Sequence, residues 1–186
     1  MLDNRASALR VLLDEQGLDA LLLTSPAHLR YFSGFTGTAG ALIVTAKETI
    51  FLTDSRYTIQ ANEEVVVDQQ REYAVQNEGI VSALTDCGAS KVGYEAENLT
   101  CAAFKRLQAV SDQRLEWLGL DRPMSVLRGI KDNDEIVALQ CGAKRQTVIT
   151  TGNRIFARFG IKRVDKIEVG PRADRSEQWF IRIEIN

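Results

Sequence analysis

SPAHLRYFSGFTG at residues 25–37 and FLTDSRY at residues 51–57 decide the fold of this 186-residue chain. The first stretch follows the apolar run ALLL at residues 20–23, which indicates a strand covered on both faces. Between the two stretches, ALIV at 41–44 and TIFL at 49–52 flank a four-residue loop, which predicts an antiparallel hairpin. Both stretches are therefore expected where a buried strand ends.

The sequence beyond these stretches alternates helices with strands. Leucines at helical spacing, including Leu9 and Leu13, predict an N-terminal helix, and Gly17 stands where a left-handed residue would end it. Further elements are expected as strands at 65–67, 91–94 and 114–118, and as helices over 76–86 and after an N-capping Thr100. Together these elements predict an α/β fold, a three-layer mixed β-sheet with helices on both faces.

Composition indicates an ordinary globular protein. A hydrophobic content of 45% and a charged content of 26% argue against disorder and fibrous repeats. No apolar run approaches the roughly 20 residues of a membrane helix, and the first residues lack the pattern of a secretion signal. Three widely spaced cysteines, Cys87, Cys101 and Cys141, suit a reducing compartment, and we expect buried, unreactive thiols. We therefore expect a cytoplasmic protein with no membrane partner.

Charge divides the chain near residue 143. Residues 1–143 carry 13 Lys and Arg against 20 Asp and Glu, whereas residues 144–186 carry 10 against 5. The basic residues of the second segment stand singly among apolar ones and form no recognisable nucleic-acid-binding module, so no nucleic-acid partner is expected. Within that segment, residues 178–185 alternate like a strand.

A boundary is predicted near Ile130. Asp132 can cap a helix while Glu135, three positions later, reaches back to its start. We therefore expect a domain over residues 1–130, a linker helix over 131–143 and an extension of unknown order over 144–186.

The first stretch ends in a glycine-rich loop. Its glycines, Gly34, Gly37 and Gly40, permit positive φ or close backbone approach, so residues 33–40 should form a tight irregular loop. Phosphate binding is disfavoured, because neither a GxxxxGK[ST] nor a GxGxxG pattern is present. Tyr31, before the loop, is expected to fill the core beneath it or to reach a pocket.

The second stretch places three polar residues where a strand passes into a helix. Asp54 or Ser55 can accept hydrogen bonds from the free N–H groups of the first helical turn. The Arg56 guanidinium meets an unfavourable helix dipole there, so it should pair with Asp54 or with an anionic partner outside the domain.

Both stretches resemble the N-terminal domain of the Xaa-Pro aminopeptidase, prolidase and creatinase family. The resemblance implies the creatinase N-terminal fold, with its ribonuclease H-like motif. In relatives a metal-bearing catalytic domain follows, and RGIKDNDEI at residues 128–136 resembles the entrance to it. The resemblance ends near residue 143, so we expect this chain to lack the catalytic domain.

The resemblance also implies site residues. In relatives, the N-terminal domain of one subunit borders the active site of the partner and confines small substrates. By that analogy the candidates for a substrate-access rim are Arg56, Tyr57, Phe35 and Tyr31. The residues of the structural motif are Asp54, Ser55, Gly34 and Gly37. The implied partners are a second copy in a homodimer or a catalytic domain, with proline-containing peptides as substrates only where that domain is present.

Catalysis by this chain is not expected. The family holds two metal ions with two Asp, one His and two Glu, and uses additional histidines. This chain has one histidine, His28, where relatives often have Asn, and no GxSxG elbow. We predict no catalytic residue, metal or cofactor here; Mn or a similar divalent metal is implied only for the absent catalytic domain.

Two further features receive structural interpretations. His28 is expected to cap the short helix after Pro26 or to form a hydrogen bond within the loop, since a metal needs several convergent ligands. Glu95 and Glu97 are expected to add negative charge near the helix after Thr100 rather than to act in catalysis.

The sequence therefore predicts a non-catalytic N-terminal domain of a proline-specific (Xaa-Pro) metallopeptidase. Such a domain would mediate dimer contacts and shape access to a catalytic site carried elsewhere. A free-standing interaction or small-molecule-binding module is one alternative. The other is a truncated or frameshifted gene product of an Xaa-Pro aminopeptidase, which the change in charge after residue 143 favours.

Overall fold

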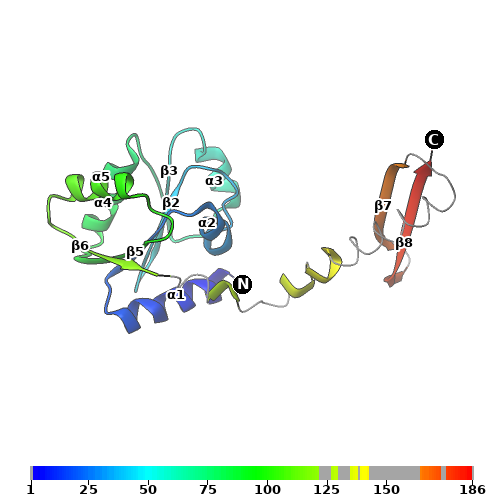
Figure 1. The fold of residues 1–186 in the computed structure, drawn as a ribbon, viewed down its shortest axis with the longest axis horizontal. Helices are drawn as coiled ribbons and strands as arrows, with labels where there is room; N and C mark the ends of the chain where they lie inside the picture. Colours follow the sequence, from blue (N-terminus) through cyan, green and yellow to red (C-terminus); the bar gives the residue numbers. More distant parts are fainter. Residues whose placement is uncertain are drawn as a thin grey trace. The chain divides into compact units, whose positions relative to one another are not determined.

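The computed structural model describes residues 2–121, 127–129, 135–137, 139–142, 164–172 and 175–185. Side chains are described from residue 5 to residue 142 within these ranges. The chain forms two compact units, Met1–Ile130 and Lys131–Asn186, each of which is considered by itself. Figure 1 shows both units, with labels on most of their elements.

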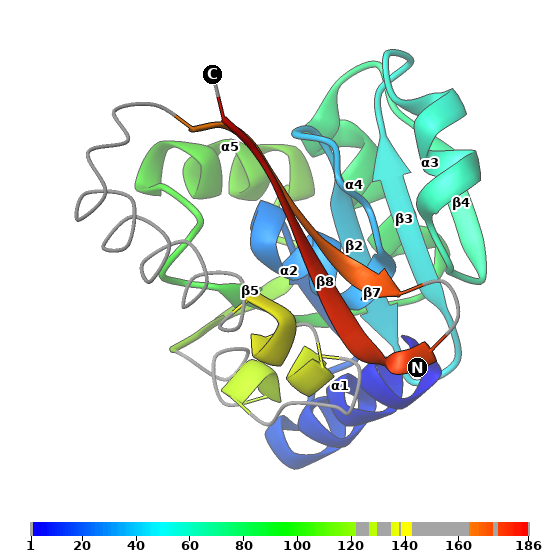
Figure 2. The same ribbon diagram turned by 90° about the vertical axis from the view of Figure 1, so that its right-hand side faces the viewer.

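The first unit is built on a six-stranded mixed sheet with the order β4-β3-β2-β1-β5-β6. Its strands are β1 (Ala20–Leu23), β2 (Ala41–Thr45), β3 (Thr49–Thr53), β4 (Gln69–Glu72), β5 (Lys91–Glu95) and β6 (Glu116–Leu120). Strand β2 pairs antiparallel with β1 and β3, and the pairs β1–β5, β5–β6 and β3–β4 are parallel. The predicted hairpin and mixed sheet are therefore confirmed. In Figure 2, α3 and β4 lie beyond β3 at one edge of the sheet.

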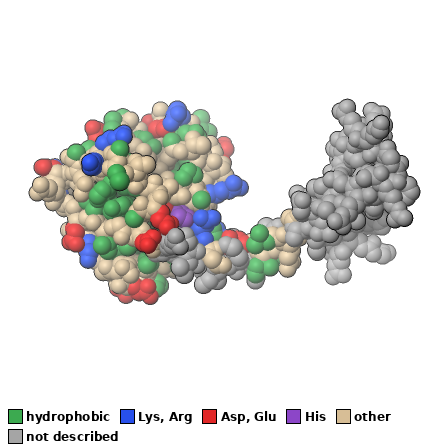
Figure 3. Space-filling model, in the orientation of Figure 1, with side chains coloured by type: hydrophobic (Ala, Val, Ile, Leu, Met, Phe, Trp, Pro, Cys, Tyr) green, Lys and Arg blue, Asp and Glu red, His purple; other side chains and the backbone are tan. Residues whose placement is uncertain are grey.

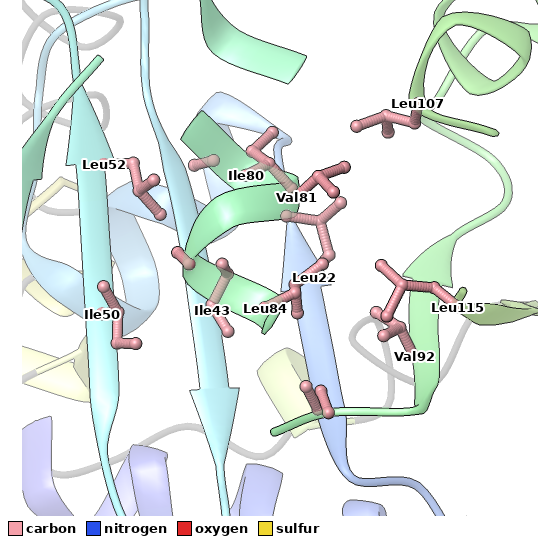
Figure 4. Close-up of a cluster of buried hydrophobic side chains, with 14 of the residues drawn as sticks. Leu22, Ile43, Ile50, Leu52, Ile80, Val81, Leu84, Val92, Leu107 and Leu115 are labelled. Carbon is pink, nitrogen blue, oxygen red and sulfur yellow. The ribbon is translucent and has the colours of Figure 1, made fainter. Parts of the chain in front are cut away.

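Helices cover both faces of the sheet. They are α1 (Leu2–Gln16), α2 (Pro26–Ser33), α3 (Thr58–Glu64), α4 (Gln76–Asp86) and α5 (Cys101–Ser111). One hydrophobic cluster joins the sheet to α1, α2 and α3 through residues such as Leu9, Phe32 and Ala61. The other joins the opposite face to α4 and α5 through Leu84 and Leu107, as Figure 4 shows. Successive residues of a strand point to opposite faces, so a continuous apolar run supplies both clusters.

Helix ends follow the predicted local chemistry. Gly17 adopts a left-handed conformation with φ 59° after α1, as expected for a helix-ending glycine. The Thr100 side chain accepts a hydrogen bond from the Ala103 N–H at 3.2 Å, which confirms it as the N-cap of α5. The helix predicted over 76–86 has those bounds.

Two strand predictions need correction. The predicted strand at 65–67 is wrong, because Val65 ends α3 and its N–H bonds the Ala61 carbonyl, while the Val66 N–H bonds the Ser33 carbonyl. The polar segment β4 takes the edge position instead, where backbone pairing with β3 matters more than side-chain burial. The strand predicted at 114–118 is displaced by two residues and is β6.

The second unit contains a two-stranded antiparallel ribbon, β7 (Val164–Arg172) and β8 (Arg175–Ile185). The strand predicted at residues 178–185 lies within β8. Helical residues are described at 135–137 and 139–142, whereas Asp132 of the predicted capping pair lies outside the described residues.

The cysteines differ in exposure from one another. Cys101 is exposed, so the prediction of three buried thiols is wrong for the residue that begins α5. Cys87 is half-buried, its Sγ donates to the Leu84 carbonyl at 3.2 Å, and burial raises the pKa of its thiol. Among the described residues, no helix combines the length and apolar character needed to cross a membrane.

Candidate functional site

Asp54 and Arg56 form an acid–base pair just after β3, in which Arg56 is exposed and Asp54 half-buried. The Asp54 Oδ1 atom accepts from Arg56 Nε at 3.0 Å, and Oδ2 accepts from Nη2 at 2.7 Å. Oδ1 also accepts from the Arg56 backbone N–H at 3.0 Å, so the carboxylate fixes the turn before α3. These bonds confirm the predicted structural pair. Ser55, between them, is exposed.

Each residue of this pair stabilises the charged form of the other. The side-chain hydrogen bond from Arg56 holds the pKa of Asp54 below its ordinary value, and the same bond raises the pKa of Arg56. The Arg56 side chain nevertheless remains 71% exposed. The result is a guanidinium with a fixed orientation at the surface.

Tyr57 lies beside this pair, whereas Phe35 does not reach the surface. The Arg56 guanidinium carbon is 5.5 Å from the centroid of the Tyr57 ring, and the Tyr57 hydroxyl lies 2.7 Å from Thr38 Oγ1. Phe35 exposes 1% of its surface and packs between Phe51 and Tyr57, with ring centroids at 4.8 and 5.7 Å. The prediction that Phe35 borders a site is corrected: its ring belongs to the core and supports Tyr57 from below.

Tyr31 has different neighbours. Its ring lies against the Arg5 guanidinium, whose carbon is 3.9 Å from the ring centroid, and Arg5 Nη1 donates to the Tyr31 carbonyl at 2.9 Å. Phe32 packs edge-on against the same ring at 4.9 Å. The structure thus brings Arg56 and Tyr57 together and gives Tyr31 a separate, half-buried setting.

The loop after α2 is as tight as its glycines predict. Gly34 has φ 88°, and a Cβ atom added there would lie 2.9 Å from the Glu64 carbonyl oxygen. A Cβ atom on Gly37 would lie 2.3 Å from the Phe35 ring. Glu64 holds the loop by accepting from the Thr36 N–H at 2.7 Å and from its hydroxyl at 2.8 Å. Those two bonds lower the pKa of the Glu64 carboxyl.

A second acid–base pair, Glu95 with His28, lies at the carboxyl ends of β1 and β5. Glu95 Oε1 contacts His28 Nδ1, and Glu95 Oε2 accepts from the backbone N–H groups of Thr24 at 2.6 Å and Ser25 at 2.9 Å. The side chains expose 6% at Glu95 and 14% at His28. Figure 3 shows the histidine in purple, largely enclosed among acidic and basic side chains.

This pair overturns both sequence interpretations of its members. His28 does not cap α2 or bond within the loop; its side chain contacts Glu95 instead. Glu95 does not serve the approach to α5, because both of its oxygens face the segment after β1. The sequence held a signal for this pair, since each residue follows a predicted strand and the carboxyl ends of adjacent parallel strands meet at one sheet edge.

Within the described residues, the Glu95–His28 pair is not part of a larger group of metal ligands. Among the described residues, no group of three or more His, Cys, Asp or Glu side chains lies close enough to hold a metal ion. Glu95 Oε1 faces His28 Nδ1, and Glu95 Oε2 accepts from two backbone N–H groups. The described part of the chain therefore does not fit the binuclear metal centre of the resembled family.

Comparisons with known proteins agree with this architecture. Residues 5–130 match the family described as the creatinase/prolidase N-terminal domain. The uncharacterized peptidase YqhT from Bacillus subtilis (strain 168) is 32% identical over 141 residues, which cover 73% of this chain and 38% of that protein. The solved structure of an Xaa-Pro dipeptidase from Bacillus anthracis has a TM-score of 0.69 and 30% identity, over 73% of this chain and 38% of that one.

An isolated domain is also similar. The N-terminal domain of the cytoplasmic peptidase PepQ from Mycobacterium tuberculosis H37Rv has a TM-score of 0.62 and 25% identity, over 67% of this chain and 98% of that one. The chain thus spans 38% of the length of the two Bacillus proteins and nearly all of this single domain. Since the match covers residues 5–130, the chain belongs to the family of creatinase/prolidase N-terminal domains, homologous to Xaa-Pro peptidases over that region.

Proposed function

We propose that the 1–130 domain is a non-catalytic partner of a metallopeptidase catalytic domain and that Arg56 and Tyr57 form part of the substrate-access rim. The observation that carries this proposal is the fixed, exposed guanidinium of Arg56. Asp54 engages two of its side-chain N–H groups, so three of the five remain for an external acceptor. The carboxylate of a short peptide is such an acceptor, since it matches the planar guanidinium.

The catalytic domain, its metal and its substrate in this proposed assembly are those that the family implies. The catalytic domain would carry a divalent metal such as Mn²⁺ and hydrolyse the Xaa-Pro bond of proline-containing peptides. It would meet this domain either in a homodimer or in a complex of separate chains. A cytoplasmic location is proposed by analogy with PepQ, which is described as cytoplasmic.

The test is reconstitution. The full chain would be mixed with the separately expressed catalytic domain of the Bacillus anthracis dipeptidase, and complex formation followed by size-exclusion chromatography. Hydrolysis of an Xaa-Pro dipeptide with Mn²⁺ would then be measured for wild type, Arg56→Ala, Arg56→Lys and the exposed control Ser55→Ala. We expect no turnover by the chain alone. In the complex, Arg56→Ala should raise KM about tenfold with little change in kcat, because a charge-assisted contact to the substrate is lost.

Arg56→Lys should restore part of the affinity through charge, and Ser55→Ala should behave as wild type. An unchanged KM for Arg56→Ala in an assembled complex would contradict the rim. Chelator-sensitive turnover by the chain alone would contradict the non-catalytic assignment.

A further inference from the structure

Strands β1 and β5 meet at a topological switch point. They are parallel neighbours, yet the chain leaves β1 into α2 on one face and leaves β5 toward α5 on the other. In open α/β sheets, ligands bind in the crevice outside the carboxyl ends of two such strands. The Glu95–His28 pair occupies the α2 side of this crevice.

A cavity of about 260 Å³ lies on the α5 side. Its lining comes from the end of β1, the glycine loop, α4 and α5, with Thr24, Thr38 and Asn77 among the polar residues. Ile80, Leu99, Ala103 and Leu107 supply apolar surface, and Figure 4 shows Leu107 extending from α5 toward α4. The polar side chains of the lining are hydroxyls and amides.

Hydrogen bonds hold the polar wall in place. Glu95 fixes the Thr24 backbone, and Asn98 Nδ2 donates to Thr24 Oγ1 at 3.2 Å. Gln76 Nε2 donates to the Gly40 carbonyl at 3.3 Å, which ties the start of α4 to the glycine loop. The cavity wall is therefore preorganised by residues of β5, of the segment that follows it and of α4.

The lining also defines the chemistry of a ligand. Asn77, in the first turn of α4, lines the cavity and carries an amide side chain that can both donate and accept hydrogen bonds. The hydroxyl oxygens of Thr24 and Thr38 already bond Asn98 and Tyr57, respectively, and each has a second lone pair that can accept from a ligand. None of the lining residues is ionisable, so a charged group placed there would lose water without gaining a countercharge.

We propose that this cavity binds a small, uncharged amide with a compact apolar body. Its volume suits a molecule of about eight to twelve non-hydrogen atoms. The amide would pair with the polar wall, and the apolar body would lie against α4 and α5. Binding at this site needs no catalytic domain, so its test is independent of the test of the Arg56 rim.

N-acetyl-leucinamide is a suitable probe, with N-acetyl-leucine as the anionic analogue and leucinamide as the cationic one. Each would be titrated into the ¹⁵N-labelled full chain at pH 7, and backbone chemical shifts followed by NMR. We expect saturable shifts for the neutral amide, with a Kd on the order of 1 mM. The shifts should fall on Thr24, the Thr38–Gly40 loop and the facing turns of α4 and α5. Both charged analogues should bind at least about tenfold more weakly.

Two variants make the test specific. Ala103→Phe should fill the cavity and abolish the shifts, whereas Ala102→Phe, at the exposed neighbouring position of the same helix, should leave them intact. Asn77→Asp adds a negative charge to the cavity lining, which supplies a countercharge for a cation, and should reverse the preference toward leucinamide. Absence of saturable shifts, shifts at other residues, equal binding by Ala103→Phe, or no change in preference for Asn77→Asp would overturn the proposal.

Discussion

Asp54–Arg56 and Glu95–His28 are both acid–base pairs at the carboxyl end of a strand, but their partners are two and 67 positions apart in the sequence, respectively. In the first pair the Arg56 side chain is 71% exposed and that of Asp54 19%, whereas Glu95 and His28 of the second pair expose 6% and 14%. The exposed pair fixes the direction of one guanidinium. The buried pair ties α2 and the end of β1 to the end of β5, so it contributes to the fold itself.

Burial makes the two pairs respond differently to mutation. Removal of one partner from a buried pair leaves the other without its hydrogen bond and away from water, which costs free energy. An exposed pair is screened by solvent and salt, so its loss changes little in stability. Three predictions test this contrast and one concerns a further carboxylate, Asp68; they are given from the largest expected effect to the smallest.

Glu95→Ala should have the largest effect. It removes the acceptor for the Thr24 and Ser25 N–H groups and for His28 together, so we expect the free energy of unfolding to fall by about 3 kcal/mol. Glu95→Gln keeps the shape and one acceptor oxygen and should cost roughly 1–2 kcal/mol. Urea denaturation followed by circular dichroism measures both. Equal midpoints for Glu95→Ala and wild type would show that the pair does not hold the strand ends.

His28→Ala should cost less, roughly 1–2 kcal/mol, because Glu95 keeps its two backbone donors. In a double-mutant cycle, Glu95→Ala with His28→Ala should show a coupling of about 1 kcal/mol, whereas Asp54→Ala with Arg56→Ala should show none beyond experimental error. The same urea titrations supply both cycles. A larger coupling in the exposed pair would reverse the contrast.

Asp68→Asn should weaken the acid dependence of stability. The Thr49 N–H and hydroxyl lower the pKa of the Asp68 carboxyl below its ordinary value of 3.8 in the folded state. Its contribution is therefore complete above that value and is lost as pH falls through the lower, folded pKa. The midpoint of urea unfolding should change less between pH 5 and pH 3 in Asp68→Asn than in wild type. An equal change in both proteins would contradict this role.

Asp54 should show the smallest effect, one of titration rather than stability. Its folded pKa lies below the ordinary value through Arg56, and Arg56→Gln or 1 M NaCl should move it upward. Side-chain carboxyl NMR titration measures this shift, and the urea midpoint of Arg56→Gln should match that of wild type at pH 7. A pKa of Asp54 that does not change with salt would contradict the prediction that solvent and salt screen its interaction with Arg56.

Local patterns in the sequence predicted most of the domain. The apolar runs at β1, β2 and β3, the capping Thr100 and the glycine after α1 act over a few residues, so they could be read directly. The Asp54–Arg56 fork belongs to the same class, because its partners are neighbours in the chain. The misplaced strand at 65–67 shows where local patterns fail. Hydrophobicity predicted a strand there, but Val65 ends α3 and the Val66 N–H donates to the last residue of α2. The polar residues of β4 form the edge strand instead.

The sequence by itself determined the helices and strands of residues 1–130 apart from the edge strand β4, the tight glycine loop and the pairing of Arg56 with Asp54. The tertiary structure decided that Phe35 is core, that His28 meets Glu95, and that a cavity lies between α4 and α5 beside the ends of β1 and β5. The physical reason is the distance over which each interaction acts along the chain. Caps, turns and hairpins are fixed by neighbouring residues, whereas a buried pair 67 positions apart depends on which strands become adjacent in the sheet.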